Sequence, residues 1–227
     1  MRRMVGRSVG RLPLHEGEVR ATARERGSHR HGVVILAAGA SRRMGTPKGL
    51  LSVKGVPVLA TMVDRLTALG AGPTVVVVGP DAASYLRDVP PQNFRYVVHE
   101  GWERGRTSSV KAGLKALGGH FASVLLWPVD HPFVSPVTIA SLWAECRTSP
   151  GSWIVPRYDG KRGHPPLLTK RALDVVMRYP DAVPLRQFPA EHPEEVVEVE
   201  VPDRGVLQNI DTPADLLAAL RETRGEA

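Results

Sequence analysis

The sequence predicts a three-layer α/β/α sandwich built on a mostly parallel, Rossmann-like sheet. Three observations indicate this fold class. Short apolar runs rich in β-branched residues alternate with amphipathic segments after residue 32. The connections between these segments are short. The clearest runs are apolar at every position, which is typical of parallel strands that helices cover on both faces.

The predicted strands are short runs of apolar residues that end at Gly, Pro or charged residues. They span residues 33–38, 74–78, 94–98, 122–127, 152–155, 166–169 and 196–201. The last run alternates Val with Glu, which predicts a half-exposed or edge strand because successive side chains of a strand point to opposite faces.

The predicted helices combine apolar residues at helical spacing with typical helix ends. They span residues 58–69, 82–86, 108–117, 137–146, 170–179 and 213–220. Asp81 and Ser108 are suitable N-caps for the second and third helices. Thr212 is the expected N-cap of the last helix, and Pro213 suits its first position.

Residues 1–30 are predicted to form a disordered basic extension, and residues 31–225 a single domain. The formal net charge of the chain is +7. Residues 1–31 hold eight Arg and three Glu, so they account for +5 of it. The rest of the chain is nearly balanced, and a nucleic-acid partner is not expected. The alternatives for the extension are a start placed too early and a nucleic-acid-binding arm.

No apolar run is long enough for a signal peptide or for a membrane span, which needs about 18 apolar residues. Arg2-Arg3 is not followed by an apolar segment, so a twin-arginine export signal is not predicted either. We therefore expect a cytoplasmic protein without a membrane partner. The single cysteine, Cys146, excludes an intrachain disulfide framework and is expected to pack as a small residue on a helix.

The loop after the first predicted strand is the most informative segment. Residues 36–48 read Leu-Ala-Ala-Gly-Ala-Ser-Arg-Arg-Met-Gly-Thr-Pro-Lys. Small residues allow the backbone to approach a ligand, and exposed amides followed by Arg43 and Lys48 suit a polyphosphate. The loop matches neither the Rossmann fingerprint nor the Walker A motif.

Two distant aspartates are candidate metal ligands. Asp130 follows a predicted buried strand, and ligands of such sheets bind beyond the carboxyl ends of the strands. Asp211 precedes the last helix. Mg²⁺ suits a site that combines few carboxylates with substrate phosphates. The structural alternatives are a turn role for Asp130 and a capping role for Asp211.

The loop resembles the signature Leu-x-Ala-Gly-x-Ser-x-Arg-Met-Gly-x-x-Lys of the molybdenum cofactor nucleotidyltransferase-like family. Every fixed position of that signature is present, from Leu36 to Lys48. The family belongs to a wider group of sugar-nucleotide and methylerythritol-phosphate nucleotidyltransferases, so the resemblance implies a fold of the nucleotide-diphospho-sugar transferase type. The resemblance implies nucleotide binding by Leu36, Ala37, Ala38, Gly39, Ser41, Arg43, Lys48 and Ser109.

The resemblance also extends to three later motifs. These motifs lie at residues 105–114, 126–132 and 208–216. Together with the loop, they imply that Asp130 and Asp211 bind Mg²⁺ and that Arg43, Lys48 and Asp130 are catalytic. A Gly-His-Pro element at residues 163–165 matches the cytidylyl branch and places His164 near the acceptor. Arg42 occupies a variable position of the signature and is expected to be solvated.

The function implied is Mg²⁺-dependent transfer of a nucleoside monophosphate onto a phosphorylated acceptor, with release of pyrophosphate. Relatives that use CTP tend to have Ala-Gly at positions 38–39, where relatives that use GTP tend to have Gly-Gly, so Ala38 favours CTP. The resemblance implies a molybdopterin-type acceptor and contact with a molybdoenzyme client.

Three alternatives to this function stay open. In the first, the chain catalyses cytidylyl or nucleotidyl transfer to a sugar or polyol phosphate. The scaffold serves an NAD(P)H-dependent reductase in the second. In the third, the chain is a non-catalytic nucleotide-binding maturation factor.

Overall fold

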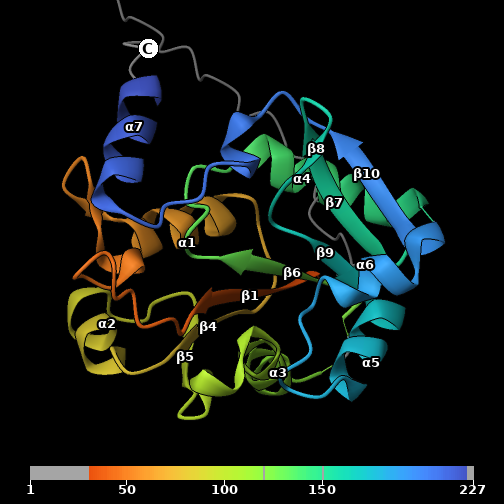
Figure 1. The fold of residues 1–227 in the computed structure, drawn as a ribbon, viewed down its shortest axis with the longest axis horizontal. Coiled ribbons are helices and arrows are strands. Elements are labelled where there is room, and N and C mark those ends of the chain that lie inside the picture. The colour runs from red at the N-terminus through yellow and green to blue at the C-terminus, as the bar shows by residue number, and fades with distance from the viewer. Residues whose placement is uncertain (1–30, 120, 150, 224–227) are drawn as a thin grey trace, which may run out of the picture.

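The computed structural model describes residues 31–119, 121–149 and 151–223, so the predicted N-terminal extension lies outside the described residues. They form a sheet of eight strands with helices on both sides (Figure 1). The domain boundaries predicted at residues 31 and 225 stay predictions. The strands are β1 (His31–Ala37), β4 (Thr74–Val78), β5 (Arg95–Val98), β6 (Ser123–Pro128), β7 (Trp153–Tyr158), β8 (Lys161–Arg162), β9 (Leu167–Thr169) and β10 (Val196–Glu200).

The strand order is β10-β7-β9-β6-β1-β4-β5, with β8 paired to β7. Strands β6, β1, β4 and β5 are parallel to one another. Strand β9 is antiparallel to both β6 and β7, and it joins this block to the parallel pair β7 and β10. Strand β10 lies at one edge, which confirms the edge strand that its alternating Val and Glu residues predict.

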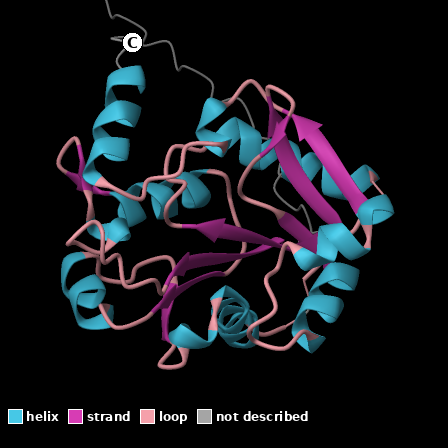
Figure 2. Ribbon diagram, in the orientation of Figure 1, coloured by secondary structure: helices cyan, strands magenta, loops and turns pink. Residues whose placement is uncertain are grey.

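Two layers of helices cover the sheet, as Figure 2 shows. The helices are α1 (Val58–Ala68), α2 (Ala82–Asp88), α3 (Arg106–Leu117), α4 (Pro136–Thr148), α5 (Lys170–Arg178), α6 (Gln187–Glu191) and α7 (Pro213–Thr223). Apolar residues of α1, α2 and α4 pack on one face of the sheet. Those of α3, α5 and α6 pack on the other face. The two cores explain why β4 and β6 are buried at every position.

One predicted helix cap is confirmed in position only, and another is wrong. Asp81 stands at the N-cap position of α2, but its side chain makes no capping hydrogen bond. Helix α3 begins at Arg106, so its N-cap is Gly105 and Ser108 lies within the first turn. The Ser108 hydroxyl instead donates to the carbonyl oxygen of Gly105 (2.7 Å). Gly105 has a positive φ of 123°, which glycine adopts readily. The helix therefore begins at Arg106, two residues before the predicted start at Ser108.

Several short elements carry no detectable sequence period. They include the hairpin of β2 (Ser52–Val53) and β3 (Val56–Pro57), strand β8 and helix α6. Further short elements are the 3₁₀ turns η2 (Lys48–Leu50), η3 (Trp102–Arg104), η4 (Pro193–Glu195) and η5 (Arg204–Val206). Two to five residues are too few to show a repeat, so pattern reasoning misses such elements.

Cys146 lies half-buried on α4 and packs against the core, as its sequence context predicts. Within the described ranges, no helix is both long enough and apolar enough to cross a membrane.

Candidate functional site

A polar cleft of about 360 Å³ lies beyond the carboxyl ends of β1 and β6. Segments that are distant in sequence meet there: the loop after β1, the first turn of α3, the residues after β6 and the segment before α7. The cleft is lined by Leu36, Ala38, Gly39, Ser41, Arg42, Arg43, Lys48, Trp102, Gly105, Arg106, Ser109, Pro128, Val129, Asp130 and Asp211. It therefore contains every predicted site residue except Ala37 and His164. The Ala37 side chain packs into the core on one face of the sheet.

Ser41 organises the loop after β1. It has a positive φ of 45°, and its carbonyl oxygen accepts hydrogen bonds from the amides of Met44 and Gly45. Its hydroxyl oxygen accepts from the amide of Lys48 (3.2 Å), where η2 begins. These bonds fold the loop back so that Lys48 returns to the cleft. Arg42 is exposed, as expected, although it also lines the cleft.

Lys48 joins the two predicted metal ligands. Its Nζ lies 2.5 Å from Asp211 Oδ1 and 3.6 Å from Asp130 Oδ2. The two carboxylates are far apart in sequence, and only the fold brings them to one point. The ammonium group is largely buried, with 15% of the side chain exposed, so these ion pairs are shielded from water.

The second oxygen of each carboxylate contacts a different neighbour. Asp130 Oδ1 lies 3.0 Å from His131 Nδ1. Asp211 Oδ2 lies 3.0 Å from Arg43 Nη2, and it accepts a hydrogen bond from Asn209 Nδ2 (3.1 Å). Each carboxylate is thus held by one oxygen and presents the other to the same cation.

Asp211 does not cap the last helix. Thr212 takes that role, since its hydroxyl oxygen accepts from the amide of Asp215 (3.3 Å). Asp215 in turn accepts from the amides of Asp211 (2.9 Å) and Thr212 (2.7 Å). This reciprocal capping confirms Thr212 as the N-cap and leaves the Asp211 carboxylate available to the cleft.

Both carboxylates are ionised at neutral pH. Burial by itself raises the pKa of Asp130, but the hydrogen bond to His131 and the charges of His131, Lys48 and Arg106 outweigh it and lower the pKa to about 2. The pKa of Asp211 is lowered chiefly by its hydrogen bond to Lys48. Two ionised oxygen donors that face one cation fit Mg²⁺, which prefers hard oxygen ligands.

Arg106 is a residue of the cleft that the sequence analysis missed. It occupies the first position of α3, and its Nη2 lies 3.9 Å from Asp130 Oδ2. Its side chain is 57% exposed, so the guanidinium is accessible to an anion. The sequence signal that could have identified Arg106 is its place directly after Gly105, at the start of a helix beyond the sheet edge.

A second cavity of about 580 Å³ adjoins the polar cleft and shares Leu36, Arg106 and Pro128 with it. Most of its wall is apolar. The further lining residues are Leu126, Trp153, Val155, Arg162, Gly163, His164, Pro166, Pro184, Leu185, Arg186 and Pro189. His164 therefore lies beside the polar cleft and not within it.

His164 is held neutral in this position. Burial is the main cause that lowers its pKa to about 4, and the positive charges of His131 and Arg106 add to it, while Asp130 opposes them. The rings of His131 and His164 are in contact, with centroids 4.5 Å apart. His164 Nδ1 is buried and has no hydrogen-bond partner within the described part of the chain.

Helix α3 supports the walls of both cavities. The hydroxyl of Thr107 donates to the carbonyl oxygen of Val183, and Lys111 Nζ contacts the carbonyl oxygen of Tyr179. Lys111 Nζ also lies 3.1 Å from Asp181 Oδ1. These contacts attach the segment that precedes Pro184 and Leu185 to the helix whose first turn borders the polar cleft.

The fold and the polar cleft together define an α/β protein of the nucleotidyltransferase class. A small-residue loop, two cationic side chains and a carboxylate pair meet at the ligand-binding edge of its sheet. Residues 33–196 match the MobA-like NTP transferase domain, and the chain belongs to that family.

Two curated relatives match about half of the chain. Nicotine blue oxidoreductase of Paenarthrobacter nicotinovorans is 31% identical over 141 residues, which cover 58% of this chain and 67% of that protein. A probable molybdenum cofactor guanylyltransferase of Natranaerobius thermophilus is 28% identical over 129 residues, which cover 56% of this chain and 60% of that protein.

Solved structures match more of the chain. Rv0371c from Mycobacterium tuberculosis H37Rv superimposes with a TM-score of 0.76 and 25% identity, over 85% of this chain and 98% of that chain. A structure of Rv0371c in complex with manganese gives a TM-score of 0.72 and 22% identity, with the same coverage. The predicted α/β/α fold is confirmed by this likeness.

Proposed function

We propose that this chain is a Mg²⁺-dependent nucleotidyltransferase that moves CMP from CTP onto a phosphorylated acceptor and releases pyrophosphate. The observation that carries the proposal is the convergence of Asp130 and Asp211 on Lys48, in a cleft that the small-residue loop also lines. Membership of the MobA-like NTP transferase family supports it.

The nucleotide would lie along the loop after β1. Leu36 to Gly39, Ser41 and Ser109 would contact the nucleoside and the phosphates through backbone amides and small side chains. Arg43 and Lys48 would offset the charge that develops on the leaving pyrophosphate, since both are positioned cations. No side-chain nucleophile is required, because an acceptor phosphate attacks the α-phosphorus directly.

Asp130 and Asp211 would hold the metal through the oxygens that now face Lys48. Mg²⁺ bound there would neutralise phosphate charge and orient the reacting oxygens. The phosphates of the nucleotide offer Lys48 a new partner, so its ammonium can leave the carboxylates. The manganese complex of Rv0371c supports a divalent ion in this fold.

The second cavity is the proposed acceptor site. Arg106 borders both cavities, so an acceptor phosphate beside it would face the polar cleft while the rest of the acceptor lies against the apolar wall. His164 would donate or accept a hydrogen bond there as a neutral imidazole. The name of the Natranaerobius relative supports a molybdopterin-type acceptor, and with it contact with a molybdoenzyme client.

CTP is proposed over GTP because Ala38, which borders the cleft, carries a methyl group where relatives that use GTP tend to have glycine, and this methyl would reduce the room for a purine. GTP is the second candidate, which the guanylyltransferase relative favours. A reductase is favoured only by the name of the Paenarthrobacter relative. The carboxylate pair around Lys48 supports transfer over reduction, since hydride transfer has no need of it.

The test is a panel of the four nucleoside triphosphates with Mg²⁺ and molybdopterin, with pyrophosphate release as the readout. Parallel reactions replace molybdopterin by methylerythritol phosphate or a sugar phosphate, and reactions without acceptor provide the background. We expect release from CTP that depends on molybdopterin. A preference for GTP would overturn the Ala38 argument, and NADPH oxidation without pyrophosphate release would contradict the transferase.

A further inference from the structure

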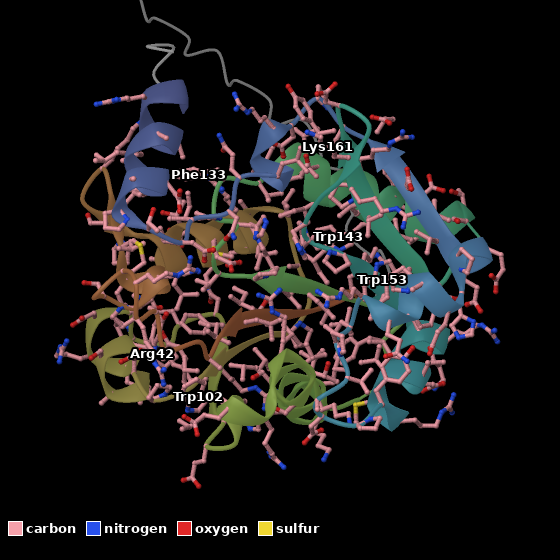
Figure 3. All side chains as sticks on the ribbon, in the orientation of Figure 1. Arg42, Trp102, Phe133, Trp143, Trp153 and Lys161 are labelled. Carbon is pink, nitrogen blue, oxygen red and sulfur yellow. The ribbon has the colours of Figure 1, made fainter. Side chains whose placement is uncertain are left out.

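Trp102 is an aromatic residue that lines the polar cleft, and the proposed reaction assigns it no role. It begins η3, between β5 and α3, and its ring is half-buried. It lines the cleft together with Ala38, Gly39 and Ser109. In Figure 3 it lies well apart from Trp143 and Trp153.

Close backbone packing holds the indole in place. A Cβ at Gly79, just after β4, would lie 2.3 Å from the carbonyl oxygen of Ala38 and 3.2 Å from Trp102 Cγ. The close approach of the Ala38 carbonyl requires glycine at this position, and the absent side chain also leaves room for the Trp102 ring. The side chain also rests on the core that α3 covers. Its position is fixed beside Ala38, at the start of the proposed nucleotide loop.

The indole N–H distinguishes Trp102 from the buried tryptophan beneath the cleft. Trp127 Nε1 donates to the carbonyl oxygen of His131 (2.9 Å). Trp102 Nε1 makes no hydrogen bond to any described residue and is not buried. A tryptophan that served the core alone would be expected to bury its ring and pair its N–H. Trp102 instead lines the cleft with a ring that is only partly buried.

The other lining residues divide the cleft by chemistry. The cations and carboxylates account for phosphates and metal, whereas Trp102 is the only aromatic residue among the lining residues of the described chain. Every nucleobase has a flat face that stacks on an aromatic ring. We propose that Trp102 is the platform on which the base of the bound nucleotide stacks. This inference rests on the proposed function.

The test compares Trp102→Leu with Trp102→Phe, which keeps an aromatic face. Calorimetry with Mg²⁺ measures the binding of CTP, of GTP and of inorganic tripolyphosphate, which has no base. We expect Trp102→Leu to bind both nucleotides about tenfold more weakly and tripolyphosphate as wild type does. Trp102→Phe should recover most of the nucleotide affinity. In turnover, Trp102→Leu should raise KM for the nucleotide and leave kcat within about twofold.

Fluorescence supplies an independent readout. CTP should quench the emission of the wild-type protein, and the quenching should disappear in Trp102→Phe, which keeps Trp127, Trp143 and Trp153. Unchanged nucleotide affinity in Trp102→Leu would overturn the inference alone. Equal loss of nucleotide and tripolyphosphate binding would indicate a structural role and overturn it too. A wild-type protein that binds no nucleotide would contradict the proposed function itself.

Discussion

The polar cleft and the second cavity adjoin each other and share Arg106, yet they differ in how they are built. In the cleft, charged side chains neutralise one another around Lys48. In the second cavity, prolines, Trp153 and Val155 form an apolar wall, and Arg162 and Arg186 also belong to its lining. The difference teaches that the charged cleft and the proposed acceptor site are built from separate sets of side chains, so single substitutions should affect one and spare the other.

The largest effect is expected from Asp130→Asn, which removes the charge of a proposed metal ligand with little change in shape. Loss of several kcal/mol of transition-state stabilisation corresponds to a decrease of about 10³ in kcat/KM for pyrophosphate release. Asp64→Asn, at an exposed position of α1, is the matched control. Activity within tenfold of wild type would exclude Asp130 as a metal ligand.

Lys48→Met should have the next largest effect. It removes the cation that both carboxylates contact and that would offset charge on the triphosphate, so we expect kcat/KM to fall about 10². Pyrophosphate release at varied nucleotide concentration measures the change, and Lys115→Met, exposed on α3, is the control. If the variant retained wild-type kcat, the transition state would not depend on this cation.

Arg106→Gln tests the residue that both cavities share. Loss of a charge-assisted hydrogen bond to the acceptor phosphate should raise the acceptor KM about tenfold and the nucleotide KM less. Initial rates with each substrate varied in turn separate the two constants. Arg178→Gln, exposed on α5, controls for the change in net charge. A rise confined to the nucleotide KM would assign Arg106 to the polar cleft alone.

The two regions also differ in how far the sequence predicts them. Residues 36–48 form a contiguous motif after a clear strand, and Asp130 and Asp211 follow or precede recognisable elements. Most residues of the polar cleft were therefore predictable, although Trp102 and Arg106 were missed and the contact of both carboxylates with Lys48 needed the fold. Trp153, Pro184 and Leu185 come from elements whose mutual placement no local pattern encodes, so the second cavity was not predictable beyond His164.

The last prediction, for His164→Gln, concerns stability in acid and no catalytic constant. The folded state holds the pKa of His164 at about 4, below its ordinary value of 6.5, so the unfolded chain binds a proton first as the pH falls. The free energy of unfolding of the wild type should therefore decrease between pH 6.5 and 4, by at most about 1.4 kcal/mol per pH unit from this group. His131, Arg106 and Asp130 face the imidazole and are present in both proteins. The difference between the wild-type and His164→Gln curves of unfolding free energy against pH therefore isolates His164.

Urea unfolding at a series of pH values measures this difference, and NMR titration of the imidazole protons measures the pKa directly. Parallel curves, or an imidazole that titrates near 6.5, would show that the second cavity does not bury His164 in solution.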